Sequence, residues 1–114
     1  MTGTSLYFVQ SNAVEGRDDE FNEWYDLVHV PDVLALDGFM SAQRFKRSTA
    51  LDGPDAGAPE FTYVALYEIE GDPVTAVKRL GTAVKAGDIP LTDSMAPGTT
   101  SILFDAIGDK VRAS

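Results

Sequence analysis

The chain of 114 residues contains no cysteine. It therefore has no disulfide bridge, no thiolate zinc site and no cysteine nucleophile. The absence of disulfides suits a reducing compartment, and we expect the protein to be cytoplasmic. The N-terminus lacks a basic region followed by an apolar run, and no segment approaches the roughly 18 apolar residues of a membrane span, so the sequence predicts no membrane association.

Positive charge is scarce. The 9 Lys and Arg residues face 18 Asp and Glu residues, which gives a formal net charge of -9. Nucleic acids and anionic lipids are bound by concentrated positive surfaces, so we expect neither as a partner. Glycine-rich phosphate loops, His-Glu-x-x-His and Gly-x-Ser-x-Gly are also absent, which leaves nucleotide hydrolysis, zinc proteolysis and the usual serine hydrolase chemistry poorly supported.

Hydrophobic periodicity predicts six elements in one domain, residues 1–114. Period-two patterns predict strands, and apolar residues at three- and four-residue spacing predict helices. The expected strands cover 5–10, 39–47, 61–69 and 102–107, and the expected helices cover 18–29 and 72–86. Glycine and proline mark loops at 48–60 and 88–99, and the second loop is a candidate cover for a cleft.

The first predicted helix carries the only Trp and the only His of the chain. Its apolar stripe consists of Phe21, Trp24, Tyr25 and Val28. Pro31 has no N–H to donate to the carbonyl of Leu27, so we expect the helix to break or kink directly after His29. A short helical turn over 31–36 can then restart with proline at its first position.

The element order indicates an α+β, ferredoxin-like β-α-β-β-α-β fold, with an antiparallel sheet and two helices on one face. The strand at 61–69 is apolar on both sides, with Tyr63 and Tyr67 on one and Val64 and Leu66 on the other. The face without helices therefore needs a cover. A homodimer is the simplest partner that provides one.

Residues 23–31, Glu-Trp-Tyr-Asp-Leu-Val-His-Val-Pro, are followed by Leu34 and by Gly38-Phe39, with Ala42, Arg44 and Phe45 further on. This pattern resembles the Trp-Tyr, His-x-Pro and Gly-Phe signature of EthD-like proteins in the dimeric α/β-barrel superfamily. The motif covers the first half of the chain, and the element order extends the resemblance to all of it. The resemblance implies two subunits that pair their sheets face to face as a dimeric α/β barrel.

The same resemblance implies a pocket in each subunit between the sheet and the first helix, with His29 as its acid or base and Trp24 and Tyr25 nearby. The superfamily includes cofactor-free monooxygenases, lactone isomerases, polyketide cyclases, dehydratases and proteins without established activity. The fold therefore does not determine the reaction. The chain has no second His for the paired site of some relatives, so we expect no metal, haem or other cofactor.

His29 follows Tyr25 by four residues, the spacing that places two side chains on one helix face. An imidazole can accept and donate a proton near neutral pH, which suits enolisation, dehydration or aldol-type cyclisation of a small carbonyl compound. We therefore take His29 and Tyr25 as the candidate catalytic pair. Alternatively, the ring nitrogens of His29 serve only to satisfy the carbonyls freed at Pro31.

Four residues are candidates for substrate binding: Trp24, Arg44, Tyr63 and Tyr67. Trp24, like Tyr25, can wall a pocket, although aromatic residues at helical spacing more often form the core. Arg44 can clamp a carboxylate or enolate, or instead pair with Asp26 or Asp32. The two strand tyrosines suit a pocket wall or a dimer interface.

These features favour a cofactor-independent enzyme of isomerase, dehydratase, cyclase or monooxygenase type. Its substrate would be a small hydrophobic compound, a carbonyl or an aromatic, and His29 would be the general acid/base. The alternative is a non-catalytic protein of the same fold that binds a hydrophobic ligand or assists another enzyme.

Overall fold

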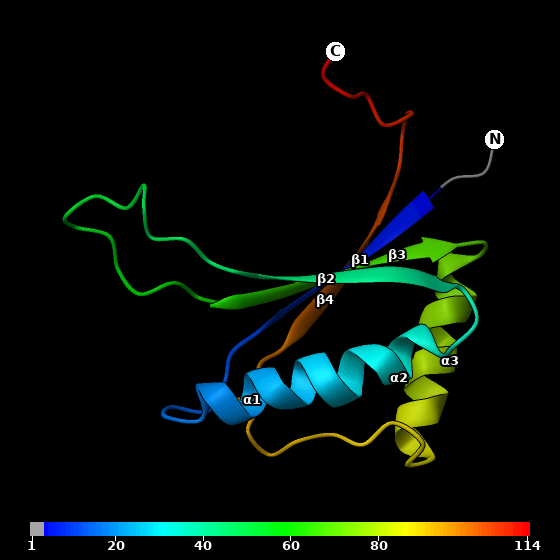
Figure 1. Cartoon of the computed structure of the whole chain (residues 1–114), viewed down its shortest axis with the longest axis horizontal. Coiled ribbons are helices and arrows are strands. Elements are labelled where there is room, and N and C mark those ends of the chain that lie inside the picture. Colours follow the sequence, from blue (N-terminus) through cyan, green and yellow to red (C-terminus); the bar gives the residue numbers. More distant parts are fainter. Residues whose placement is uncertain (1–3) are drawn as a thin grey trace.

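The computed structural model describes residues 4–114. In chain order the elements are β1 (Thr4–Ser11), α1 (Asp18–Trp24), the π-helix η1 (Tyr25–His29), α2 (Val30–Leu34), β2 (Phe39–Lys46), β3 (Tyr63–Glu70), α3 (Pro73–Lys85) and β4 (Thr100–Asp105). The strands form one antiparallel sheet in the order β2-β3-β1-β4. All helices lie on one side of this sheet (Figure 1). The predicted α+β, ferredoxin-like fold is confirmed.

The local signals in the sequence place the elements well. Each predicted strand boundary lies within two residues of the observed one. Asp72 caps α3, because its carboxylate accepts a hydrogen bond from the Val74 N–H at 3.2 Å, and Pro73 occupies the first helical position. Gly87 follows the helix with a φ of 82°, a conformation that glycine adopts without steric cost.

Of the break or kink expected at Pro31, the break is wrong, although a π turn ends at His29 and Pro31 lies in the first turn of α2. His29 and Val30 both have helical dihedral angles, and the chain passes from α1 through η1 into α2 as one continuous helix (Figure 1). Within η1 the bonding has π spacing, as in the bond from the Val30 N–H to the carbonyl of Tyr25. The extra residue in a π turn shifts the bonding register, so the helix continues although Pro31 has no N–H. His29 thus lies inside the helix and not at its end.

The hydrophobic core lies between the helices and the sheet. β3 contributes alternate residues to it, and the helices place aromatic and aliphatic side chains against them. The buried cluster consists of Phe21, Tyr25, Val33, Phe39, Tyr63, Ala65, Tyr67, Ile69 and Ala76. Tyr67 and Ile69 are each at most 1% exposed, so this face of β3 is completely covered.

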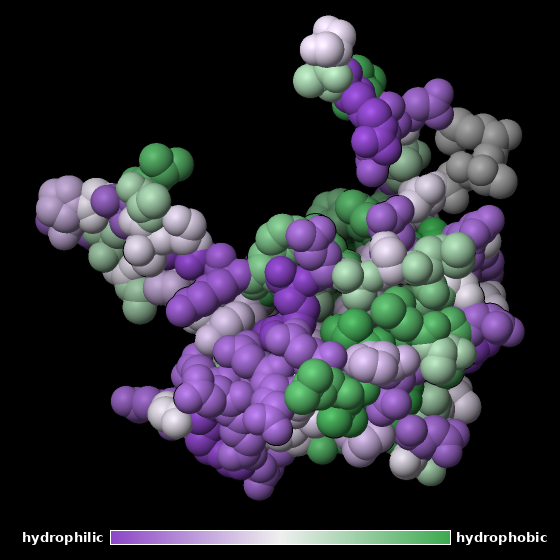
Figure 2. Space-filling model, viewed as in Figure 1, coloured by the Kyte–Doolittle hydropathy of each residue, from purple (hydrophilic) through white to green (hydrophobic). Residues whose placement is uncertain are grey.

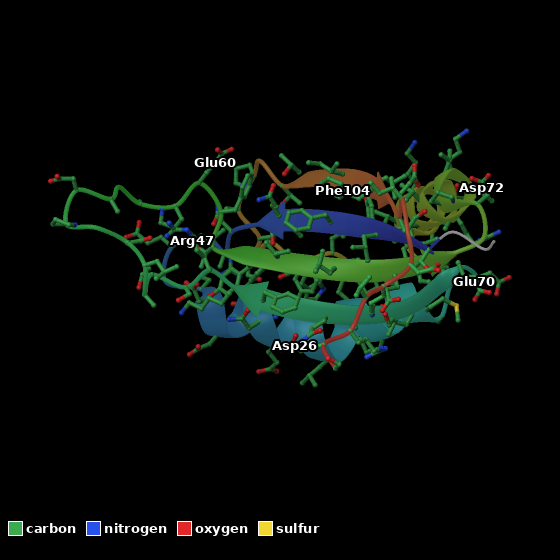
Figure 3. The ribbon with its side chains drawn as sticks, turned by 90° about the horizontal axis from the view of Figure 1, so that it is seen from above. Asp26, Arg47, Glu60, Glu70, Asp72 and Phe104 are labelled. Carbon is green, nitrogen blue, oxygen red and sulfur yellow. The ribbon has the colours of Figure 1, made fainter. Side chains whose placement is uncertain are left out.

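The opposite face of the sheet, which we call the open face, is covered by no helix within residues 4–114. At one end of it, residues of the C-terminal segment line a cavity together with Leu6 and Phe104. Register pairs Phe8 of β1 with Leu66 of β3 and with Ile102 of β4, and Leu6 with Phe104. Figure 3 views the molecule from this side and shows Phe104 on β4. Phe104 is 50% exposed and Ile102 is 47% exposed. The predicted second apolar face therefore exists, and in this chain it meets solvent.

Two segments extend away from the sheet and helices. The connection between β2 and β3, residues 47–62, projects beyond the sheet, and residues 106–114 project on the side opposite the helices (Figure 1). A bidentate ion pair between Arg47 and Asp52, at 3.0 and 3.1 Å, braces the start of the first segment. Within residues 4–114, no helix has the length and apolar character needed to cross a membrane.

Candidate functional site

The side chain of His29 lies within the aromatic cluster under the helix. Its ring stacks on Trp24 with centroids 4.5 Å apart, and it meets the ring of Tyr25 edge to face at 5.1 Å. The indole N–H of Trp24 donates to the carbonyl of Pro90 at 3.2 Å, which fixes the stacking partner. The helix thus brings together the three residues that the sequence singled out.

The environment of His29 favours its neutral form. The ring is half-buried, and its Nδ1 atom is buried without a hydrogen-bond partner among the described residues. Burial lowers the pKa of His29 to about 4, because the charged imidazolium loses hydration. Asp32 opposes this shift, and the positive charge of Arg44 adds to it. At neutral pH the imidazole is therefore uncharged and able to accept a proton.

The capping role considered for His29 does not match this geometry. A capping imidazole would use its nitrogens to bond carbonyls released by a helix break, but the helix is unbroken and Nδ1 has no partner. A buried polar atom without a partner costs roughly 1–3 kcal/mol relative to a satisfied one. Such an atom in a folded protein calls for an explanation other than capping.

Arg44 of β2 lies on the other side of Tyr25. Its guanidinium carbon is 4.3 Å from the centroid of the Tyr25 ring, within cation–π range. One terminal nitrogen donates to Asp26 at 2.9 Å and the other donates to Asn22 at 2.8 Å. The pairing of Arg44 with Asp26 confirms one of the two uses considered from the sequence, and Asp32 takes no part in it.

Both candidate strand tyrosines lie on the helix-covered face and not on the open face. The hydroxyl of Tyr63 donates to Asp18 at 2.6 Å and accepts a hydrogen bond from Asn22 at 3.4 Å. The hydroxyl of Tyr67 is buried without a partner, and burial, followed by the proximity of Tyr25, raises its pKa. Burial also raises the pKa of Tyr25. Both phenols are therefore protonated at neutral pH, and neither is placed to serve as a base.

A cavity of about 650 Å³ runs along the free edge of β2, beneath the helix. Its lining residues are Asn22, Asp26, Val30, Ala42, Gln43, Arg44, Phe45, Lys46 and Tyr63. We call it the β2-edge pocket. Among the residues predicted from the sequence, it contains Arg44 and Tyr63 but neither His29 nor Trp24. The candidate residues thus form two groups, one on each side of Tyr25.

Sequence reasoning missed Asn22 and Asp18, which orient Arg44 and Tyr63. A signal for Asn22 exists: Asn22, Asp26 and Val30 follow one another at four-residue spacing and so form a second stripe beside the aromatic one. All three line the β2-edge pocket. No comparable signal marks Asp18. The described residues include no group of three His, Asp or Glu side chains placed to hold a metal ion.

Solved structures similar to this chain were found, but no family model and no curated protein matches it. A candidate monooxygenase from Shewanella loihica PV-4 is 12% identical, with a TM-score of 0.61, over 96% of this chain and 99% of that one. HapK from Hahella chejuensis is 16% identical, with a TM-score of 0.58, over 98% and 99%.

A protein of the EthD (ethyl tert-butyl ether) family from Bacillus halodurans C-125 is 13% identical, with a TM-score of 0.53, over 97% of this chain and 100% of that one. Matches at such low identity establish the fold and leave the reaction open. They agree with the resemblance drawn from residues 23–45 and with the strand order of the sheet. This chain therefore has the ferredoxin-like fold of EthD-like proteins.

Proposed function

We propose that the protein is an enzyme in which His29 acts as a general base toward a small carbonyl or aromatic compound. The observation that carries the proposal is the state of His29: neutral at pH 7, with a buried Nδ1 that has no partner. The stacked ring of Trp24 and the edge contact with Tyr25 hold the imidazole in one orientation. Orientation and protonation state are two of the properties that a catalytic base requires, and the third is contact with the substrate.

The chemistry follows from the environment of His29. A proton leaves a carbon next to a carbonyl, or an aromatic hydroxyl, and binds to an imidazole nitrogen, while its electron pair remains on the substrate as an enolate or phenolate. The resulting anion pairs with the imidazolium and offsets the loss of hydration that lowers the pKa of His29. Because the base is weak, the substrate must be an activated one, with an acidic C–H or O–H bond.

Return of the proton to another atom gives isomerisation, and loss of a hydroxide from the enolate gives dehydration. A monooxygenase reaction would start from the same anion, which O₂ would then oxidise. The candidate monooxygenase among the similar structures supports this third possibility through the fold alone. All three reactions share the deprotonation by His29 and require no cofactor for that step.

A non-catalytic ligand-binding protein is the second candidate function. The observation that favours it is that His29 does not line the β2-edge pocket, so that a ligand there is separated from the imidazole by Tyr25. In that case the pocket would bind a small molecule without changing it. Binding that persists without any proton exchange would distinguish this function from catalysis.

The proposal includes a homodimer in which a second copy covers the open face. Phe8 and Phe104 meet edge to face at 6.0 Å on the β1-β4 side of this face, beside Leu6 and Ile102. Exposed apolar patches of this kind mark protein–protein contacts in soluble proteins. A two-fold pair would place each patch against its own copy, as an isologous interface requires.

Proton exchange in D₂O tests the catalytic proposal without knowledge of the natural substrate. We would incubate the protein with small ketones, 1,3-diketones and hydroxyaromatic compounds and follow loss of the substrate C–H signals by ¹H NMR. The expected result is exchange with at least one activated compound, reduced at least about 100-fold in His29→Gln. A Lys85→Gln variant, changed at the far end of α3, is the control. Equal exchange by the wild type and His29→Gln would contradict the proposal.

A further inference from the structure

The β2-edge pocket has a local charge opposite to that of the chain. Arg44 and Lys46 line it with two positive charges, and Asp26 contributes one negative charge, so its wall is positive by one charge in a chain of net charge -9. Lys46 forms no ion pair within residues 4–114. Figure 2 shows that the surface over α1, at the lower left, is mostly hydrophilic, and α1 begins with three acidic residues. The two cationic side chains therefore make this pocket a local site of attraction for a small anion on a surface that otherwise repels anions.

The two side chains of the ion pair in this pocket, Arg44 and Asp26, differ in how firmly they are held. The side chain of Arg44 is 13% exposed and is fixed by the Tyr25 ring and by Asn22. The side chain of Asp26 is 58% exposed and meets Arg44 through a single 2.9 Å contact. An exposed ion pair of this kind contributes only about 0.2–1 kcal/mol. Asp26 lies at the rim of the molecule (Figure 3). Arg44 is therefore a fixed cation, and its counter-ion Asp26 can be replaced by another anion.

The remaining walls set the shape of the ligand. Val30 and Ala42 give the pocket an apolar part, and Tyr63 adds an aromatic ring, whereas Phe45 is paired with Val64 and has its side chain on the open face. β2 is an edge strand, so backbone groups on its free side have no partner in the sheet and are available to a polar ligand. The volume of about 650 Å³ lies within the range of small-molecule sites.

We propose that the β2-edge pocket binds the carboxylate of a small molecule with an apolar or aromatic body. The carboxylate replaces that of Asp26 on Arg44 and approaches the ammonium group of Lys46, while the body lies against Val30 and Ala42. Asp26 then serves as a substitute anion that keeps Arg44 paired when the pocket is free. This site does not depend on His29 acting as a base, so it can exist in an enzyme or in a binding protein.

Benzoate and its neutral isostere benzamide provide the test. We would titrate each into ¹⁵N-labelled protein at pH 7 and low salt, and follow the backbone signals of residues 42–46. Benzoate is expected to shift these signals and to bind at least about tenfold more tightly than benzamide, because a charge-assisted contact with a guanidinium needs an anion. Asp26→Asn is expected to tighten benzoate binding up to about fivefold, since it removes the competing carboxylate.

Lys46→Gln is expected to weaken benzoate binding several-fold, whereas the control Lys85→Gln leaves it unchanged. His29→Gln is also expected to bind benzoate normally, which separates this site from the proposed catalytic base. Both Asp26 and Lys46 are exposed, so their variants should fold even if replacement of Arg44 prevents folding. Equal binding of benzoate and benzamide, no binding of benzoate, or weaker binding in Asp26→Asn would overturn the proposal.

Discussion

The two faces of the sheet are built from the same four strands but have opposite surroundings. On the helix-covered face, Tyr67 and Ile69 are almost inaccessible, and buried polar atoms of His29, Arg44 and Tyr67 have no hydrogen-bond partner within residues 4–114. On the open face, aliphatic and aromatic side chains meet solvent. The covered face thus buries polar atoms, and the open face exposes apolar side chains to water. Both arrangements are unfavourable for the stability of a single chain.

The two faces therefore lower the stability of the single chain in different ways. On the covered face, three buried polar atoms lack a partner among the described residues, and each of them lowers the stability of the fold. Such groups are typical of sites where chemistry takes precedence over stability. The open face exposes apolar side chains to solvent, and exposed apolar patches in soluble proteins mark contacts with a partner. Function is therefore expected on both faces, but of different kinds.

The sharpest way to test the contrast is to remove one Phe from each face. Phe21 is fully buried, and Phe21→Ala is expected to lower the free energy of unfolding by about 3–5 kcal/mol through lost burial and a cavity. Phe104→Ala on the open face should change it by less than about 1 kcal/mol under dilute conditions. Urea denaturation followed by Trp24 fluorescence measures both. Similar losses of unfolding free energy in the two variants would show that both faces contribute equally to the stability of the single chain, against this prediction.

The pH dependence of stability tests the buried imidazole on the covered face. The pKa of His29 is about 4 in the folded protein and 6.5 without the shift, so between these values the unfolded chain binds more protons. Stability from this group is fully present above pH 6.5 and is lost as the pH falls toward 4, by about 2–3 kcal/mol in all. His29→Phe, which keeps a ring beside Trp24, should flatten this part of the curve.

The measurement is urea denaturation at pH steps from 7 to 4, with the difference between wild type and His29→Phe as the result, because both proteins contain the same carboxylates. Trp24 also reports directly, since a protonated imidazole stacked at 4.5 Å should quench its fluorescence. A midpoint near pH 6.5 in the folded protein would mean that the ring is hydrated, and the neutral state proposed for the base would lose its basis.

Much of the fold was predictable because its signals are local. Alternation in 61–69 identified β3, and Asp72-Pro73 identified the start of α3. The helix at Pro31 was mispredicted because the rule that proline ends a helix assumes α-type hydrogen bonds. The π turn at Tyr25–His29 shifts the hydrogen-bond register directly before Pro31, so the helix continues. No local pattern in the sequence distinguishes these two outcomes.

The sequence singled out residues that the structure brings together around Tyr25, but it did not show that they form two separate groups. Arg44 and His29 were both singled out, yet their positions on opposite sides of Tyr25 depend on how β2 lies beneath the helix. That is a property of tertiary packing. The anchor Asn22 was missed for the same reason, because its partner is 22 residues away on a strand.

The open face is tested next by placing a charge on it. Phe104→Glu should weaken the proposed dimer at least about tenfold, because a carboxylate in an apolar interface loses its hydration without gaining a partner. Sedimentation velocity across micromolar concentrations measures the association. Ile107→Glu in the exposed C-terminal segment is a control of equal charge outside the sheet. A wild type that is monomeric throughout this range would exclude the dimer, whatever the variants do.

The smallest expected effect concerns α3, the thinner of the two helical covers. Only Ala76 and Ala83 of this helix are buried, so packing holds it less firmly than the aromatic helix, and its cap should matter correspondingly more. Asp72→Ala removes the bonds to the Val74 N–H and to the Thr75 hydroxyl, which should cost about 1 kcal/mol. Asp72→Asn, which retains a capping oxygen, should recover most of it. If both variants unfold at the wild-type urea concentration, the cap at Asp72 does not stabilise α3, and this helix is held on the covered face by packing alone.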